Sequence, residues 1–190
     1  MAGCTKRRLF IDLETFSSVD IKAGVFKYVE APDFEILLIA YAWDDEPVQM
    51  VDMITPVHPD EAQRLTGWLW DALLDPNIIK VAHNSAFERA ALGKWRGKYL
   101  PPEQWEDTMI LAANCGLPLK LETCCEALNM GEDKAKMRVG AALIREFCCP
   151  QKRPLKKWNY AKWITPEMDP ENWELFKQYC RRFIHCKKEQ

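Results

Sequence analysis

The stretch Leu9-Phe10-Ile11-Asp12-Leu13-Glu14 decides the fold expected for this chain. Its apolar residues alternate with the others, which is the period of a β-strand, so Asp12 and Glu14 leave the same face. Two carboxylates about 7 Å apart on a central strand repel each other unless a cation lies near them. Hard oxygen ligands favour magnesium or manganese. The alternative is an exposed edge strand with ordinary surface acids.

The rest of the chain predicts a sheet flanked by helices. Apolar runs predict further strands at residues 25–30, 34–43, 48–54, 78–82 and 105–108. Amphipathic or capped segments predict helices at residues 59–74, 84–95, 110–114, 121–128, 137–147 and from 171 onward. The short links between the first strands favour antiparallel neighbours. We therefore expect an α/β fold with a mixed sheet, of which the ribonuclease H-like fold is one example.

Composition excludes several classes of protein. The chain has 190 residues, 48% of them hydrophobic and 28% charged, which favours one globular domain over a disordered or fibrous protein. No apolar run is long enough for a membrane helix, and no signal peptide is evident. The eight cysteines include no C-x-x-C motif and there are only three histidines, which argues against a zinc site. Reduced thiols in the cytoplasm are the expectation.

The net charge of −2 conceals an asymmetry. Residues 30–75 hold eleven acidic side chains and one basic one, whereas residues 134–157 hold eight basic side chains and one acidic one. A basic stretch of this kind suggests a polyanionic partner. Solvated helix faces are an equally good explanation of the charges alone.

Two further motifs carry candidate functional residues. In the first, His83-Asn84 ends a predicted strand, and Glu88 falls one turn inside the next helix. That helix start could bind a phosphate, or Asn84 could simply be an N-cap with Glu88 near the positive helix end. In the second, Tyr179 and Phe183 share one face of the last helix, where core packing is the simpler explanation.

In this order and spacing, the motifs resemble the 3′–5′ exonuclease domain of family-A DNA polymerases encoded by phages and prophages. These domains belong to the DEDD exonucleases, in the subclass that uses a tyrosine. The resemblance extends from Leu9 to about Arg182. It includes Ile11-Asp12-Leu13-Glu14-Thr15, Ala31-Pro32-Asp33-Phe34-Glu35-Ile36-Leu37-Leu38, Asp44-Asp45-Glu46-Pro47-Val48, His83-Asn84-x-x-Phe87-Glu88-Arg89, Gly116-Leu117-Pro118 and Trp173-Glu174-Leu175-Phe176.

The resemblance implies hydrolysis of single-stranded DNA from its 3′ end by a two-metal mechanism. Asp12, Glu14 and Glu88 would hold two divalent ions, Mg²⁺ or Mn²⁺, and Tyr179 would orient the attacking water. Residues that match positions holding the 3′-terminal nucleotide in the family are Thr15 and Asn84. The implied location is the cytoplasm of a bacterial host, with the gene in the host or a phage.

The last motif departs from the family pattern. Where the family has the last metal-binding aspartate, four residues after the tyrosine, this chain has Phe183, and it stops at Gln190. We therefore expect a single exonuclease-like domain over residues 1–190, without a polymerase domain and apparently truncated at its C-terminus. Activity would be impaired. The alternative is a degenerate domain that binds nucleic acid or a partner protein, such as a separate polymerase, without cutting.

Overall fold

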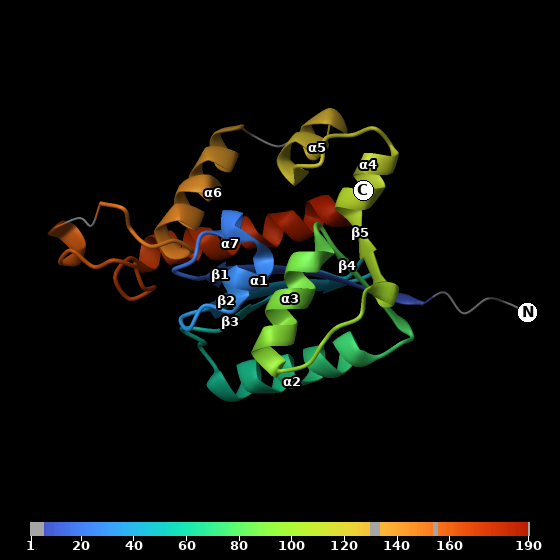
Figure 1. The fold of residues 1–190 in the computed structure, drawn as a ribbon, viewed down its shortest axis with the longest axis horizontal. Helices are drawn as coiled ribbons and strands as arrows, with labels where there is room; N and C mark the ends of the chain where they lie inside the picture. Colours follow the sequence, from blue (N-terminus) through green and yellow to red (C-terminus); the bar gives the residue numbers. More distant parts are fainter. Residues whose placement is uncertain (1–5, 130–133, 154–155, 190) are drawn as a thin grey trace, which may run out of the picture.

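The centre of the molecule is a five-stranded sheet in the order β3-β2-β1-β4-β5 (Figure 1). It is seen in a computed structural model that describes residues 6–129, 134–153 and 156–189. The strands are β1 (Arg7–Phe16), β2 (Glu35–Trp43), β3 (Gln49–Asp52), β4 (Ile78–Ala82) and β5 (Trp105–Asp107). β1 pairs antiparallel with β2 and parallel with β4, so it is a central strand and not an edge strand. The α/β fold with a mixed sheet that the sequence predicted is confirmed.

Helices cover both faces of this sheet (Figure 1). They are α1 (Val25–Val29), α2 (Pro59–Leu74), α3 (Ser85–Arg96), α4 (Thr108–Asn114), α5 (Leu121–Ala127), α6 (Lys134–Phe147) and α7 (Pro170–Glu189). On one face, Leu9, Ile11 and Leu13 of β1 pack with side chains of α1, α2 and α3. On the other, Phe10 and Phe16 pack with side chains of α6 and α7. The alternation of β1 side chains thus separates two hydrophobic cores.

Helix α7 covers the second face by packing on β1 and β2. Its buried residues Trp173, Phe176, Cys180 and Ile184 recur every three or four positions, which places them on one stripe of the helix. The Trp173 indole Nε1 donates a hydrogen bond to Asp52 Oδ2 at 2.8 Å. This bond ties the start of α7 to the end of β3.

The strand predicted at residues 25–30 is wrong, because this segment forms α1. Its β-branched and aromatic composition favours a strand, but helical geometry turns Tyr28 and Val29 into the core and leaves Phe26 exposed. The Tyr28 hydroxyl donates to the Thr15 carbonyl at 3.1 Å. A tertiary contact with β1 therefore overrides the local preference.

The other predicted elements are present, with ends that differ by up to three residues. Residues 59–74 and 78–82 form α2 and β4 with the predicted bounds. No disulfide joins the cysteines whose side chains are described. Within the described ranges, no helix combines the length and hydropathy needed to cross a bilayer.

Candidate active site

Asp12 and Glu14 lie on the face of β1 that α7 covers, and both are partly exposed. The pairing of β1 with β2 changes register between Glu14 and Thr15, which marks a β-bulge. A bulge re-aims the side chains around it. Thr15 lies on the opposite face from Glu14, as the alternation of a strand requires, and its Oγ1 is 2.9 Å from the Tyr28 hydroxyl. The buried Thr15 hydroxyl thus faces the core, and its role in substrate binding stays a prediction.

Two thiols hold the carboxylate of Glu14. The Cys180 Sγ donates to Glu14 Oε1 at 3.4 Å, and the Cys148 Sγ donates to Glu14 Oε2 at 3.7 Å. Burial raises the pKa of both thiols well above the usual value, and the Glu14 charge raises it further. Both cysteines are therefore protonated donors at neutral pH. Sequence reasoning missed them, because 134 and 166 residues separate them from Glu14.

Tyr179 lies beside the same carboxylates. Burial raises the pKa of its phenol far above the ordinary value, and the charges of Glu14 and Asp12 raise it further. The ring also packs directly on the backbone of α6, because a Cβ placed on Gly140 would overlap its Cε2, Cζ and Cδ2 atoms. A glycine in α6 therefore makes room for the tyrosine of α7.

The junction of β4 and α3 differs from both interpretations of its sequence. Asn84 is the N-cap residue of α3, but its side chain makes no capping bond and its backbone is left-handed, with φ of 67°. The Asp107 carboxylate accepts hydrogen bonds from the N–H groups of Asn84 at 2.9 Å and Ser85 at 2.7 Å. It also accepts from the N–H of Met109 at 3.0 Å, at the start of α4. The backbone N–H groups of Asn84 and Ser85, at the start of α3, therefore already donate to Asp107 and are not available to bind a phosphate.

The three predicted metal ligands are not equally placed. Asp12 and Glu14 share one face of β1, and their carboxylate oxygens suit magnesium or manganese. Glu88, in the first turn of α3, is only 3% exposed. Among the residues that the structure describes, no group of three or more His, Cys, Asp or Glu side chains could hold a metal ion. The pair thus fits a divalent cation by its donor chemistry, whereas a site shared by all three carboxylates stays a prediction.

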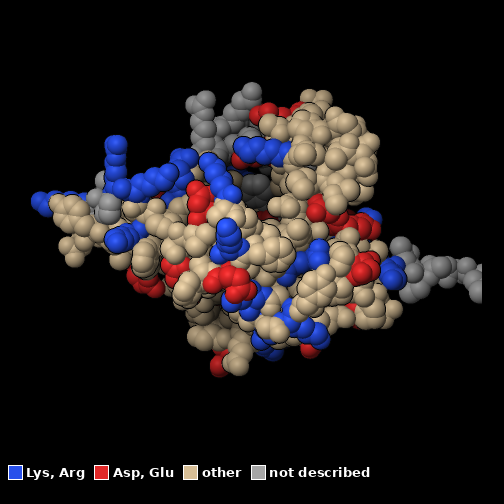
Figure 2. Space-filling view, viewed as in Figure 1, with Lys and Arg blue, Asp and Glu red and all other residues tan. Residues whose placement is uncertain are grey.

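The predicted basic stretch is exposed where it is described. Figure 2 shows Lys and Arg side chains gathered over the end of α6 and the loop that follows it. The exposed residues there include Arg145, Lys152, Arg153, Lys156 and Lys157. The Lys157 Nζ also lies 3.4 Å from Oδ2 of Asp169, the residue directly before α7. The side chains of residues 134–138 and of Phe183 lie outside the described part.

Comparison with known proteins identifies one close relative. The sequence is 45% identical over 183 residues to the DNA polymerase of Bacillus phage SP02. The aligned region covers 96% of this chain and 27% of that polymerase, so the chain spans about a quarter of its length. No protein-family model matches the chain. The resemblance to a phage DNA polymerase predicted from the motifs is confirmed.

Matches to solved structures are more distant. Exonuclease I matches with a TM-score of 0.43 and 14% identity, over 65% of this chain and 35% of its own. Escherichia coli RNase D, an exoribonuclease involved in structured RNA processing, matches with a TM-score of 0.42 and 19% identity, over 96% of this chain and 45% of its own.

Proposed function

This chain is a homologue of one segment of a phage DNA polymerase, and on that premise we propose that it is a 3′–5′ exonuclease-like domain for single-stranded DNA ends. The observation that carries the proposal is the grouping of Asp12, Glu14 and Tyr179 between β1 and α7. A paired carboxylate face beside a buried phenol suits the hydrolysis of a phosphodiester.

We assign the binding of two divalent ions, Mg²⁺ or Mn²⁺, to Asp12, Glu14 and Glu88. Such ions, when bound, stabilise the charge of the reacting phosphate and lower the pKa of water. The thiols of Cys148 and Cys180 fix the orientation of Glu14.

Tyr179 keeps its proton in this proposal. Because its pKa is raised, the phenol is a neutral hydroxyl at physiological pH and serves to orient a water molecule. It does not act as a general base. Asn84, exposed at the end of β4, would contact the terminal nucleotide. Thr15 is buried, and both its hydroxyl and its carbonyl contact the Tyr28 hydroxyl, so it is not part of the proposed nucleotide contact.

The exposed basic residues of the loop after α6, which are Lys152, Arg153, Lys156 and Lys157, would hold the phosphates of the bound strand. For single strands, each phosphate contact contributes roughly 0.7 to the slope of log affinity against log salt concentration. Replacing Lys152, Arg153, Lys156 and Lys157 together by alanine should therefore reduce the magnitude of that slope by up to about 3. An unchanged slope would show that these residues form an ordinary solvated surface and do not contact the phosphates.

The second candidate is a domain that binds a DNA 3′ end, or a separate polymerase, without cutting. Two observations favour it. The family's last metal-binding aspartate is replaced by Phe183, which cannot ligate a cation. In addition, the described residues contain no three-ligand group for a metal ion.

A 5′-labelled single strand separates the two candidates. The unmodified chain should shorten it slowly or not at all with magnesium, and Phe183→Asp should raise shortening from the 3′ end. Asp12→Asn in the Phe183→Asp protein should abolish that gain. If both proteins bind the strand and neither shortens it with magnesium or manganese, the chain is a binding domain. Full activity that Phe183→Asp does not alter would contradict the assigned role of position 183.

A further inference from the structure

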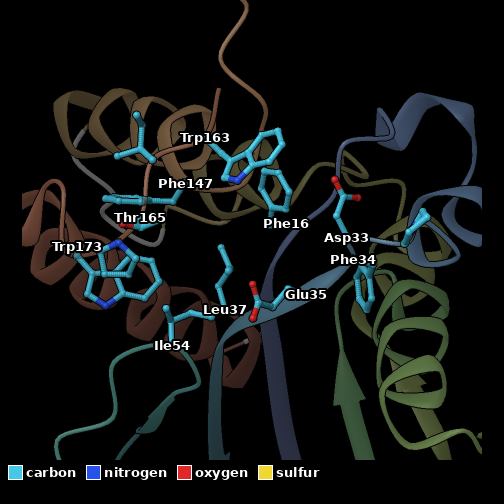
Figure 3. A pocket seen from close by; sticks show the side chains of 13 residues that line it. Phe16, Asp33, Phe34, Glu35, Leu37, Ile54, Phe147, Trp163, Thr165 and Trp173 are labelled. Carbon is cyan, nitrogen blue, oxygen red and sulfur yellow. The ribbon is translucent and has the colours of Figure 1, made fainter. Parts of the chain in front are cut away.

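A cavity of about 370 Å³ opens at the carboxyl end of β1 (Figure 3). Its walls come from segments far apart in the sequence: the end of β1, the start of β2, the end of α6, the loop before α7, and α7 itself. The large aromatic side chains that line it are Phe16, Phe34, Phe147, Trp163 and Trp173. The volume lies in the range of roughly 300 to 1,000 Å³ that is typical of small-molecule sites.

The aromatic walls suit a flat ring. Phe16 is buried, whereas Trp163 is 45% exposed at the mouth, and the two ring centroids lie 5.7 Å apart at an interplanar angle of 52°. The exposed Trp163 indole thus packs on the buried Phe16 ring and leaves one of its own faces open to a ligand. Nucleobases stack on such surfaces whatever their sequence, since each base has a π-face.

Two carboxylates determine which part of a nucleotide fits. Figure 3 shows the Glu35 carboxylate pointing into the cavity from the start of β2, and Asp33 also lines the cavity. Asp33 is fixed, because its Oδ1 accepts from the Ser18 N–H at 3.2 Å and the Ser18 hydroxyl at 2.9 Å. Carboxylates repel a phosphate but accept hydrogen bonds from base amino groups, such as N4 of cytosine. The cavity therefore favours a base over a phosphate.

The surroundings place this cavity along the path of a single strand. Phe16 follows Glu14 by two residues on the same strand, so the cavity adjoins the candidate active site. The loop that supplies Trp163 also carries Lys156 and Lys157, which are exposed. Phosphates on that loop would leave an adjacent base within reach of the cavity.

We propose that this cavity is a subsite for one unpaired nucleobase, stacked on Trp163, and that Glu35 favours bases with an amino group, cytosine above thymine. The inference rests on the proposed substrate class, single-stranded DNA. It adds a binding site beyond the reacting phosphate and a base preference.

Binding of short dC and dT homopolymers to the full chain, with EDTA present to prevent cleavage, tests the subsite. Trp163→Ala should weaken binding roughly 5- to 150-fold, the effect of losing one stacked base. Trp68→Ala is the matched control, because Trp68 is a tryptophan of similar exposure (43%) on α2, and it should leave binding unchanged. Equal effects of the two substitutions would overturn the proposal.

The base preference has its own control. Glu35→Gln should bring the ratio of dC to dT affinity close to one, whereas Glu167→Gln, the same charge change in the loop before α7, should preserve it. A ratio that Glu35→Gln leaves unaltered would refute the role of Glu35. The outcomes also separate the two proposals. Binding that depends on Trp163, without any cleavage by the Phe183→Asp protein, would sustain the subsite and overturn the exonuclease activity. Cleavage by that protein with no effect of Trp163→Ala on binding would do the reverse.

Discussion

The contact between Gly140 and Tyr179 leads to a quantitative prediction. Glycine to alanine in a helix interior normally stabilises a protein by about 1 kcal/mol. At Gly140, however, a Cβ would lie closer than 3.0 Å to three ring atoms of Tyr179. Overpacking of this kind costs roughly 1 to 3 kcal/mol. Gly140→Ala should therefore lower the free energy of unfolding by up to about 2 kcal/mol, despite the better helix propensity.

Urea unfolding of four proteins isolates the clash: the unmodified chain, Gly140→Ala, Tyr179→Ala and the double variant. With the ring removed, Gly140→Ala should stabilise by about 1 kcal/mol, so the coupling energy of the pair should be about 1 to 3 kcal/mol. Gly67→Ala in α2 is the control, because no atom beyond its chain neighbours and its own helix backbone lies within 4 Å of its Cβ position. It should stabilise both backgrounds equally.

The same substitution should also affect chemistry. A displacement of about 1 Å in a positioning group can reduce rate roughly 100-fold. In the Phe183→Asp protein, Gly140→Ala should therefore lower 3′-end shortening by about that factor, whereas Gly67→Ala should not. If Gly140→Ala stabilises the chain by about 1 kcal/mol with Tyr179 present, the packing of this ring on α6 is wrong.

Three further predictions concern polar groups that are buried or partly buried. Burial lowers the pKa of Lys80 to about 8, so between about pH 8 and 10.5 the unfolded chain binds more protons than the folded chain. The free energy of unfolding should therefore rise with pH over this range by roughly 1 to 3 kcal/mol. Lys80→Met should remove that rise in urea titrations. Asp107→Ala removes the caps of two helices and should cost about 1 to 4 kcal/mol, measured by urea unfolding against the conservative Asp107→Asn. Glu14→Gln should shift the infrared S–H stretching bands of Cys148 and Cys180, and unshifted bands would contradict both hydrogen bonds.

The elements that the sequence predicted are those whose burial follows a simple period. β1 alternates between two cores, and α2 repeats its apolar residues along one side, so both could be located from hydropathy. The strand predicted at residues 25–30 failed because its conformation depends on Tyr28 reaching β1. No local pattern reports such a contact.

Only part of the candidate site could likewise be predicted from the sequence. The positions of Asp12 and Glu14 on one face follow from strand geometry alone. What surrounds them does not, because the thiols that hold Glu14 come from the residue after α6 and from α7. The cap that Asp107 provides to α3 joins residues 22 and 23 positions apart, and no capping motif in the sequence has that range. Contacts of this kind are set by tertiary packing.

Helix α7 carries both the residues that anchor it to the sheet and the candidate active-site residue Tyr179. The anchoring stripe consists of Trp173, Phe176, Cys180 and Ile184, whereas the side chain of Phe183 lies outside the described residues. The effect of Phe183→Asp on the docking of α7 therefore needs its own measurement, the free energy of unfolding of the two proteins in urea. If the two values agree, a difference in nuclease activity between the unmodified chain and Phe183→Asp reports on the missing carboxylate and not on the docking of α7.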